Sequence, residues 1–241
     1  MPIVSVPSRS SSPLRPLPSS FVATRESLHR VAERIVAPAR KPDNEIALEP
    51  AQGGFGTPSF RYQGRQHRVR VEGDELVHEV DGEERRAPLT SLASASGAVT
   101  ELVPGEAQLD NEPLEVDCGA SRALAAWYEF GQRALQTLIA EAKAEDDPSP
   151  PILWPEHFDL AIELGPEDPG ARANYGFSPG DEDHDEPYAY VGPWRAEVEG
   201  ELWRATGFRG AELGYSELLA ADDQLAAVLD FLRTRKEALA G

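Results

Sequence analysis

Cysteine is almost absent from the chain, which has only Cys118 among its 241 residues. One thiol cannot form an intramolecular disulfide, whereas secreted chains of this size more often carry cysteine pairs. The first twenty residues also lack the continuous apolar segment of a secretory signal. We therefore expect the protein to reside in the cytoplasm.

Long apolar runs and basic charge are scarce as well. No stretch approaches the roughly 20 uninterrupted apolar residues of a membrane helix. Lysine and arginine together number 23, against 42 acidic residues, which gives a formal net charge of −19. Because affinity for phosphate backbones and anionic lipids depends on lysine and arginine, we expect neither a nucleic-acid nor a membrane partner.

Several catalytic signatures are missing. The chain contains no G-x-S-x-G, H-E-x-x-H, G-x-x-x-x-G-K-[ST], G-x-G-x-x-G or C-x-x-C pattern. Standard hydrolase, zinc-protease, nucleotide-hydrolase and dinucleotide-binding functions therefore lose support.

The pattern of the first half predicts a helix followed by a β meander. Residues 1–20 hold seven serines and five prolines and are expected to form a disordered tail. Thr24 can cap a helix whose apolar residues recur at helical spacing as far as Val36. Residues 60–86 resemble an antiparallel ribbon with three turns, at Gln63-Gly64, Gly73-Asp74 and Asp81-Gly82. We assign residues 21–89 to this unit.

The second half repeats the order of helix and strands. Residues 90–119 have no stable period and are expected to be a linker or a long connection. Residues 120–241 begin with a helix opened by Gly119 or Ser121, continue with strands and end with a helix from about Asp222. The expected fold is α+β, with antiparallel sheets packed by about three helices, in one domain or two.

The halves also share short segments. Ala47-Leu48-Glu49 is similar to Ala161-Ile162-Glu163, and the segment 54–58 is similar to the segment 176–180. A degenerate internal duplication and a chance similarity of glycine- and proline-rich turns are both open explanations.

Residues 156–164 alternate as in a strand, with apolar side chains on one face and His157 and Asp159 side by side on the other. A carboxylate beside an imidazole can orient it as a general base, and the same pair can bind a metal. We take His157 and Asp159 as candidate catalytic residues, and both of them together with Asp181 as candidate ligands of a divalent metal. The alternative is an ordinary solvated face of a sheet.

The stretch that follows contains further polar and aromatic groups. Tyr188 and Tyr190 share a strand face, as suits the wall of a pocket or a face covered by a helix. The acidic run 181–186 departs from a calcium loop, which needs Gly where Glu186 stands and Glu where Gly192 stands, and is expected to be a solvated loop. The candidate ligand-binding residues are Asn174, Tyr175, Ser178, Asp181, Glu186, Tyr188, Tyr190 and Trp194.

The remaining histidines give weaker signals. His78 lies between inward-facing residues and is expected to be a core histidine with satisfied hydrogen bonds. His29 and His67 have no polar cluster around them in the sequence.

Four segments carry a family resemblance: 153–159 (LWPEHFD), 174–176 (NYG), 178–181 (SPGD) and 186–194 (EPYAYVGPW). They resemble conserved proteins of unknown function from high-GC actinobacteria. The resemblance implies a cytoplasmic actinobacterial protein and brings no activity with it.

Two functional hypotheses follow. In the first, residues around His157, Asp159, Tyr188 and Tyr190 bind a small molecule or a metal ion, with or without catalysis. In the second, the acidic and aromatic surface docks a basic protein partner and catalyses nothing.

Overall fold

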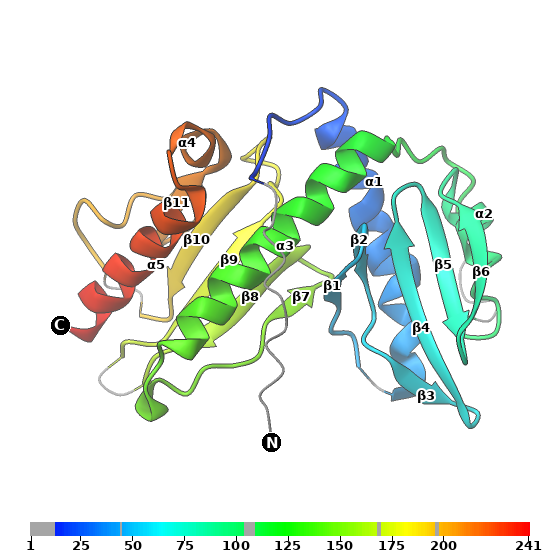
Figure 1. Cartoon of the computed structure of the whole chain (residues 1–241), viewed down its shortest axis with the longest axis horizontal. Coiled ribbons are helices and arrows are strands. Elements are labelled where there is room, and N and C mark those ends of the chain that lie inside the picture. The colour runs from blue at the N-terminus through cyan, green and yellow to red at the C-terminus, as the bar shows by residue number, and fades with distance from the viewer. Residues whose placement is uncertain (1–12, 44, 104–108, 168–169, 196–197) are drawn as a thin grey trace, which may run out of the picture.

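Two antiparallel sheets and five α-helices make up the computed structural model, which describes residues 13–43, 45–103, 109–167, 170–195 and 198–241. The fold is therefore α+β, as predicted. A six-stranded sheet from the first half lies beside a five-stranded sheet from the second half (Figure 1). None of the helices in the described part of the chain combines the length and apolar character of a membrane-spanning segment.

The first half begins with helix α1 (Phe21–Val31), which continues through a π-helical turn (Ala32–Val36) and a 3-10 turn (Pro38–Asp43). The expected cap, Thr24, lies inside α1, where its hydroxyl donates to the Glu115 carbonyl at 3.0 Å. The sheet has the order β1-β2-β4-β5-β6 with β3 beside β4. Its strands are β1 (Glu49–Ala51), β2 (Gly54–Gly56), β3 (Phe60–Tyr62), β4 (Arg65–Glu72), β5 (Glu75–Val80) and β6 (Glu83–Pro88).

The three predicted turns of this sheet are confirmed. They join β3 to β4, β4 to β5 and β5 to β6 in consecutive hairpins. At the last turn Asp81 and Gly82 have φ angles of 50° and 88°. A two-residue hairpin loop requires this left-handed backbone, which Asp and Gly tolerate better than most residues.

The second half begins with helix α3 (Cys118–Ala140), whose cap is Asp117 and not Gly119 or Ser121, since its side chain accepts from the Ala120 amide. A five-stranded antiparallel meander follows in the order β11-β10-β9-β8-β7. Its elements are β7 (Ile152–Trp154), β8 (Asp159–Leu164), β9 (Ala173–Ser178), β10 (Tyr188–Pro193), β11 (Ala211–Gly214) and the helices α4 (Tyr215–Ala220) and α5 (Gln224–Ala240).

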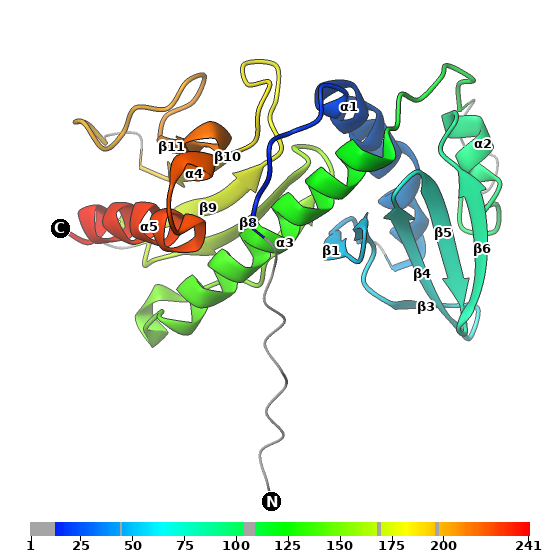
Figure 2. The same cartoon turned by 45° about the horizontal axis from the view of Figure 1, so that its top comes forward.

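Helix α3 ties the halves together. It packs against α1, β1 and β2 on one side and against β8, β9 and α5 on the other, and one continuous hydrophobic core runs through both halves. Figure 2 shows α3 crossing the molecule between the two sheets. At the centre, Leu48 and Leu153 exchange two backbone hydrogen bonds of 3.0 Å.

Each half is thus a helix followed by an antiparallel sheet and a short helix, with six strands in the first half and five in the second. Helix α2 (Leu92–Ser96) in the first half corresponds to α4 in the second. The architecture repeats, but the similar sequence segments do not occupy equivalent strands. Residues 54–56 form the second strand of the first meander, whereas residues 176–178 end the third strand of the other. The segment similarity is therefore offset by one strand from the structural repeat.

Two predicted connecting segments contribute to the core. Of the expected tail, residues 1–12 lie outside the described residues, but Leu14 is buried and its amide donates to the Gln224 side chain at 2.8 Å. The expected linker 90–119 contains α2, and its residues Leu92, Val99 and Leu102 are buried. Residues 13–20 are therefore not a disordered tail. Residues 90–103 do more than connect the two halves.

The faces of the second sheet differ sharply. Its apolar side chains, Leu160, Ile162, Tyr175, Phe177, Ala189 and Val191, are buried on the side covered by α3 and α5. By strand alternation, the other face carries Asp159, Asn174, Gly176, Ser178, Tyr188 and Tyr190.

Candidate functional site

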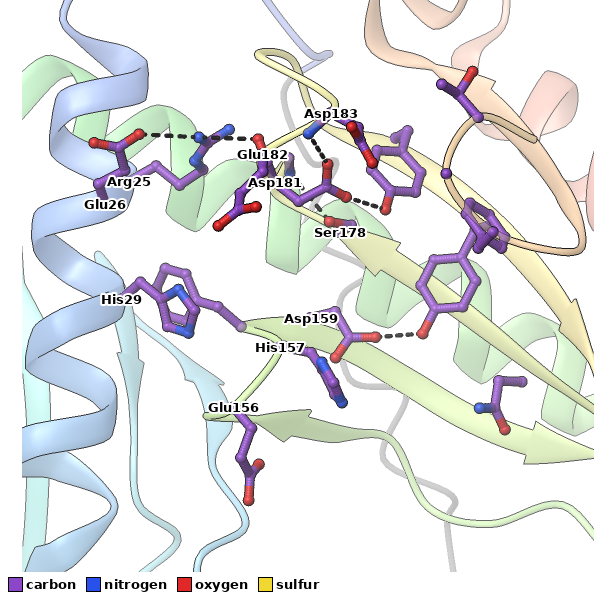
Figure 3. Close-up of a pocket in the computed structure, with 18 residues that line it drawn as sticks. Arg25, Glu26, His29, Glu156, His157, Asp159, Ser178, Asp181, Glu182 and Asp183 are labelled. Carbon is purple, nitrogen blue, oxygen red and sulfur yellow. Dashed lines mark hydrogen bonds and ion pairs between the residues drawn. The ribbon is translucent and has the colours of Figure 1, made fainter.

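A cavity of about 800 Å³ opens on the face of the second sheet that α3 leaves uncovered. Its walls come from α1, the turn between β7 and β8, the strands β8 to β10, the loop after β9 and residues 206–208. Figure 3 shows Asp159 and Asp181 reaching toward this space from different parts of the chain. The cavity therefore collects residues far apart in sequence.

Most of the predicted site residues meet in this cavity. Those that line it are His157, Asp159, Asn174, Ser178, Asp181, Tyr188 and Tyr190. Three lie outside it. Tyr175 faces the core and is 0% exposed, Glu186 accepts from the Ser216 hydroxyl at 2.6 Å, and Trp194 is 50% exposed with its indole N–H donating to Asn174.

The predicted pairing of His157 with Asp159 on one strand is wrong. β8 begins at Asp159, and Phe158 has a φ of 54°, so residues 155–158 form the turn between β7 and β8. His157 is exposed on this turn, and no hydrogen bond joins it to Asp159 among the described residues. The His157 imidazole acts on Asp159 only by electrostatic attraction, which lowers the pKa of the Asp159 carboxyl.

Asp159 is the most deeply buried acid of the cavity, at 6% exposure. Its Oδ2 accepts a short hydrogen bond from the Tyr190 hydroxyl, while its Oδ1 has no hydrogen-bond partner among the described residues. Burial raises the pKa of this carboxyl above its ordinary value, although Tyr190 and His157 act in the opposite direction. A desolvated carboxyl at a cleft, with one oxygen that has no partner among the described residues, points to a binding site.

Gly176 leaves room for the hydrogen bond between Tyr190 and Asp159. It stands opposite Tyr190 in the β9–β10 ladder and opposite Ala161 in the β8–β9 ladder. A Cβ atom at Gly176 would clash with the Tyr190 ring and hydroxyl. The phenol therefore lies across the bare backbone of β9 to reach β8.

A second hydrogen-bonded group surrounds Asp181. Its carboxylate accepts from the Tyr188 hydroxyl at 2.6 Å and contacts His184 Nδ1 at 2.8 Å, while His184 Nε2 lies 3.1 Å from Glu212. Burial opposes protonation of His184, but its bonds to Asp181 and Glu212 outweigh that effect and raise its pKa. Burial alone would raise the pKa of Asp181, yet the bonds from Tyr188 and His184 lower it. This group is a satisfied network of charges.

Arg25 of α1 holds the acidic loop in place. Its guanidinium donates to the carbonyls of His184 at 3.0 Å and Asp181 at 3.4 Å and packs against Gly180, where a Cβ atom would clash with it. The side chain is 7% exposed and also pairs with Glu26. The acidic run is consequently an anchored loop with a solvated outer side.

Three cavity residues on α1, Arg25, Glu26 and His29, were not predicted as site residues. Besides Arg25, His29 lines the cavity, stacks on Phe158 at 5.0 Å and donates from Nε2 to the Pro155 carbonyl at 2.9 Å. The available signal for Arg25 and His29 was their spacing of four residues, which puts two polar side chains on one face of the first predicted helix. Phe208, at another wall, had no comparable signal.

The metal candidates of the sequence analysis do not form a coordination group. Within the described ranges, the set of three potential ligands whose atoms lie within 4.8 Å of one another is His67, His78 and Glu101, in the other half of the molecule. His157, Asp159 and Asp181 therefore serve better as separate polar groups of a ligand cavity.

Comparison with family models, curated proteins and solved structures found no match for this chain. The resemblance to actinobacterial proteins stays a prediction, and the function must be inferred from the cavity itself.

Proposed function

We propose that the cavity binds a small organic cation, with an ammonium or guanidinium group directed at Asp159. The observation that carries the proposal is the buried Asp159 Oδ1, which has no partner among the described residues. A cationic N–H donor at this carboxyl would stabilise its ionised form, whose burial is otherwise unfavourable.

The charge of the lining supports a cation. Among the described residues that line the cavity, the one arginine is Arg25. Its guanidinium already binds backbone carbonyls and Glu26. The six acidic lining residues are Glu26, Glu156, Asp159, Asp181, Glu182 and Asp183. Such a cavity repels phosphates and carboxylates and attracts positive ligands.

The aromatic wall supports an organic cation over a bare metal ion. The rings of Tyr188, Tyr190 and Phe208 lie 5.9–6.2 Å apart, centroid to centroid, around one side of the cavity. Aromatic faces attract ammonium and guanidinium groups and pack against their carbon atoms. Asp159 would fix the charged end while these rings hold the rest of the ligand.

The proposal is one of binding and includes no chemical step. A general base made of His157 and Asp159 would need a hydrogen bond between them, which the described residues do not make. We also propose a cytoplasmic location, which the single cysteine supports. The net charge of −19 supports the absence of nucleic-acid and membrane partners.

Titration calorimetry of the full chain at about pH 8 tests the proposal. The ligands are agmatine and butylammonium, with butanol and butyrate as neutral and anionic controls. Cations should bind and the controls should not. Asp159→Asn should weaken binding at least about 30-fold, since loss of one partner of a buried charge pair costs about 2 kcal/mol or more.

Glu237→Gln is the matched control, because Glu237 is an exposed acid on α5 outside the cavity. Equal binding by Asp159→Asn and wild type, or no binding of any cation, would contradict the proposal. A lysine-rich peptide forms a separate arm. Tight binding of the peptide with weak binding of free amines would identify a basic side chain of a protein partner as the source of the cation.

A further inference from the structure

A second cluster of potential ligands lies in the first sheet, far in sequence from the acidic cavity. His67 on β4 and His78 on β5 face the covered side of that sheet and are 2% and 0% exposed. Glu101, in the connection after α2, is nearby with a side chain that is 39% exposed. One ligand atom from each of the three lies within 4.8 Å of the others.

The two imidazoles meet directly. His67 Nδ1 lies 3.0 Å from His78 Nε2, and His78 Nδ1 lies 3.0 Å from the Ala98 carbonyl oxygen. Because a carbonyl oxygen only accepts, His78 Nδ1 carries a hydrogen and its Nε2 presents a lone pair. A backbone carbonyl on the far nitrogen is the arrangement that orients metal-binding histidines in proteins.

His67 has a nitrogen with no use in the fold. Its Nε2 is buried and has no hydrogen-bond partner among the described residues. The rings of Phe60 and Tyr62 pack around this imidazole at 5.7 Å and 5.9 Å. A buried polar atom without a partner costs free energy, whichever ring nitrogen carries the hydrogen.

We propose that His67, His78 and Glu101 bind a divalent transition metal of the class of Zn²⁺. Two imidazole nitrogens and one carboxylate oxygen are a donor set that such ions prefer, with a position left open for water or another ligand. Mg²⁺ and Ca²⁺ prefer oxygen ligands throughout and are poor candidates.

The spacing of the nitrogens fits one metal ion. Two nitrogens on a tetrahedral zinc lie about 3.3–3.4 Å apart, given Zn–N bonds of about 2.0–2.1 Å. His67 Nδ1 and His78 Nε2 are 3.0 Å apart, so their separation would increase by about 0.3–0.4 Å as both rings turn toward a shared ion. The proton that they share in the metal-free protein then moves to His67 Nε2, the atom that now lacks a partner.

Glu101 connects the site to solvent. Its Oε1 lies 3.8 Å from His78 Nδ1, and its side chain is 39% exposed. Glu101 therefore gives the ion a route from solvent to the two buried imidazoles.

Equilibrium dialysis of chelator-treated protein against Zn²⁺, Co²⁺ and Mg²⁺, followed by elemental analysis, tests this assignment. One equivalent of Zn²⁺ or Co²⁺ and no Mg²⁺ should bind. The Co²⁺ form should show visible ligand-field absorption, and its thermal stability should rise with metal concentration by mass action. His67→Gln and Glu101→Gln should each lower metal affinity at least about 10- to 100-fold, the loss seen even for outer-shell partners.

Asp159→Asn and Glu237→Gln serve as controls and should retain full metal affinity, which separates this site from the acidic cavity. Glu101 is at the surface, so its variant should fold even if a substitution of His78 does not. Failure of folded wild-type protein to bind Zn²⁺ or Co²⁺ would overturn the assignment, as would unchanged affinity in His67→Gln.

Discussion

Asp159→Asn is expected to raise the stability of the protein while it weakens cation binding. The substitution removes a buried charge and keeps an oxygen that can accept from Tyr190. A buried polar atom without a partner costs about 1–3 kcal/mol, and more when charged. The new amide places two N–H groups where no described residue offers an acceptor, so we expect a gain near the lower end, about 1 kcal/mol in the free energy of unfolding at neutral pH.

The gain should depend on pH in a defined direction. In the unfolded chain an Asp titrates near pKa about 3.9, whereas burial raises the pKa of Asp159 in the fold. Between the two values the folded chain keeps a proton that the unfolded chain has lost, so the contribution of Asp159 to stability falls as pH rises through that window. The Asp159→Asn variant does not lose this stability, so its free energy of unfolding relative to wild type should rise as pH increases.

Calorimetric melting from about pH 4 to about pH 8 measures this effect. For a chain of this size, 1 kcal/mol corresponds to about 2–4 °C in Tm, so the variant should melt about that much higher at the upper end and nearly equal to wild type at the lower end. Glu182→Gln is the control, because Glu182 is an exposed carboxylate lining the same cavity. A variant less stable than wild type at every pH, or a difference independent of pH, would refute the account of Asp159.

Three further substitutions test the supports of the cavity. Gly176→Ala should displace the Tyr190 ring, destabilise the fold by about 1–3 kcal/mol through overpacking and weaken cation binding in calorimetry. Arg25→Met should lose charged hydrogen bonds to the 181–185 loop, cost about 2 kcal/mol in urea denaturation and speed proteolysis within that loop; unchanged cleavage would argue against the anchoring role. Leu14→Ala should cost about 2 kcal/mol in the same denaturation assay, whereas no loss would mean that residues 13–20 add nothing to the core.

Local signals predicted much of the fold. The three hairpin turns follow from Gly and Asp residues that accept left-handed backbone, and the alternation of β10 correctly separates Tyr188 and Tyr190 from the buried Ala189 and Val191. The strand start at Asp159 was missed because the positive φ of Phe158 is imposed by packing, not by a residue type that favours it. Period-two alternation alone therefore extended the strand over a turn and placed His157 wrongly.

The histidine pair shows a signal that was present in the sequence but not combined. A two-residue turn at Gly73-Asp74 fixes the register of β4 and β5, which pairs His67 with Val80 and Val69 with His78. This register puts both histidines on the inward face as diagonal neighbours across the two strands. Glu101 and Arg25 could not be placed in this way, because their positions depend on the packing of segments far apart in the chain.

The paired backbone of Leu48 and Leu153 has a consequence for self-association. Free N–H and C=O groups on an edge strand act as templates for pairing with other molecules. The inner edges of the two sheets meet at this bridge, which limits their access to other chains. The outer strand β6 exposes four charged residues in succession, from Glu83 to Arg86, and charged side chains on an edge strand disfavour the addition of another strand. The inner sheet edges are thus paired with each other, while the outer strand β6 is the charged one. Both features disfavour edge-to-edge association of separate molecules.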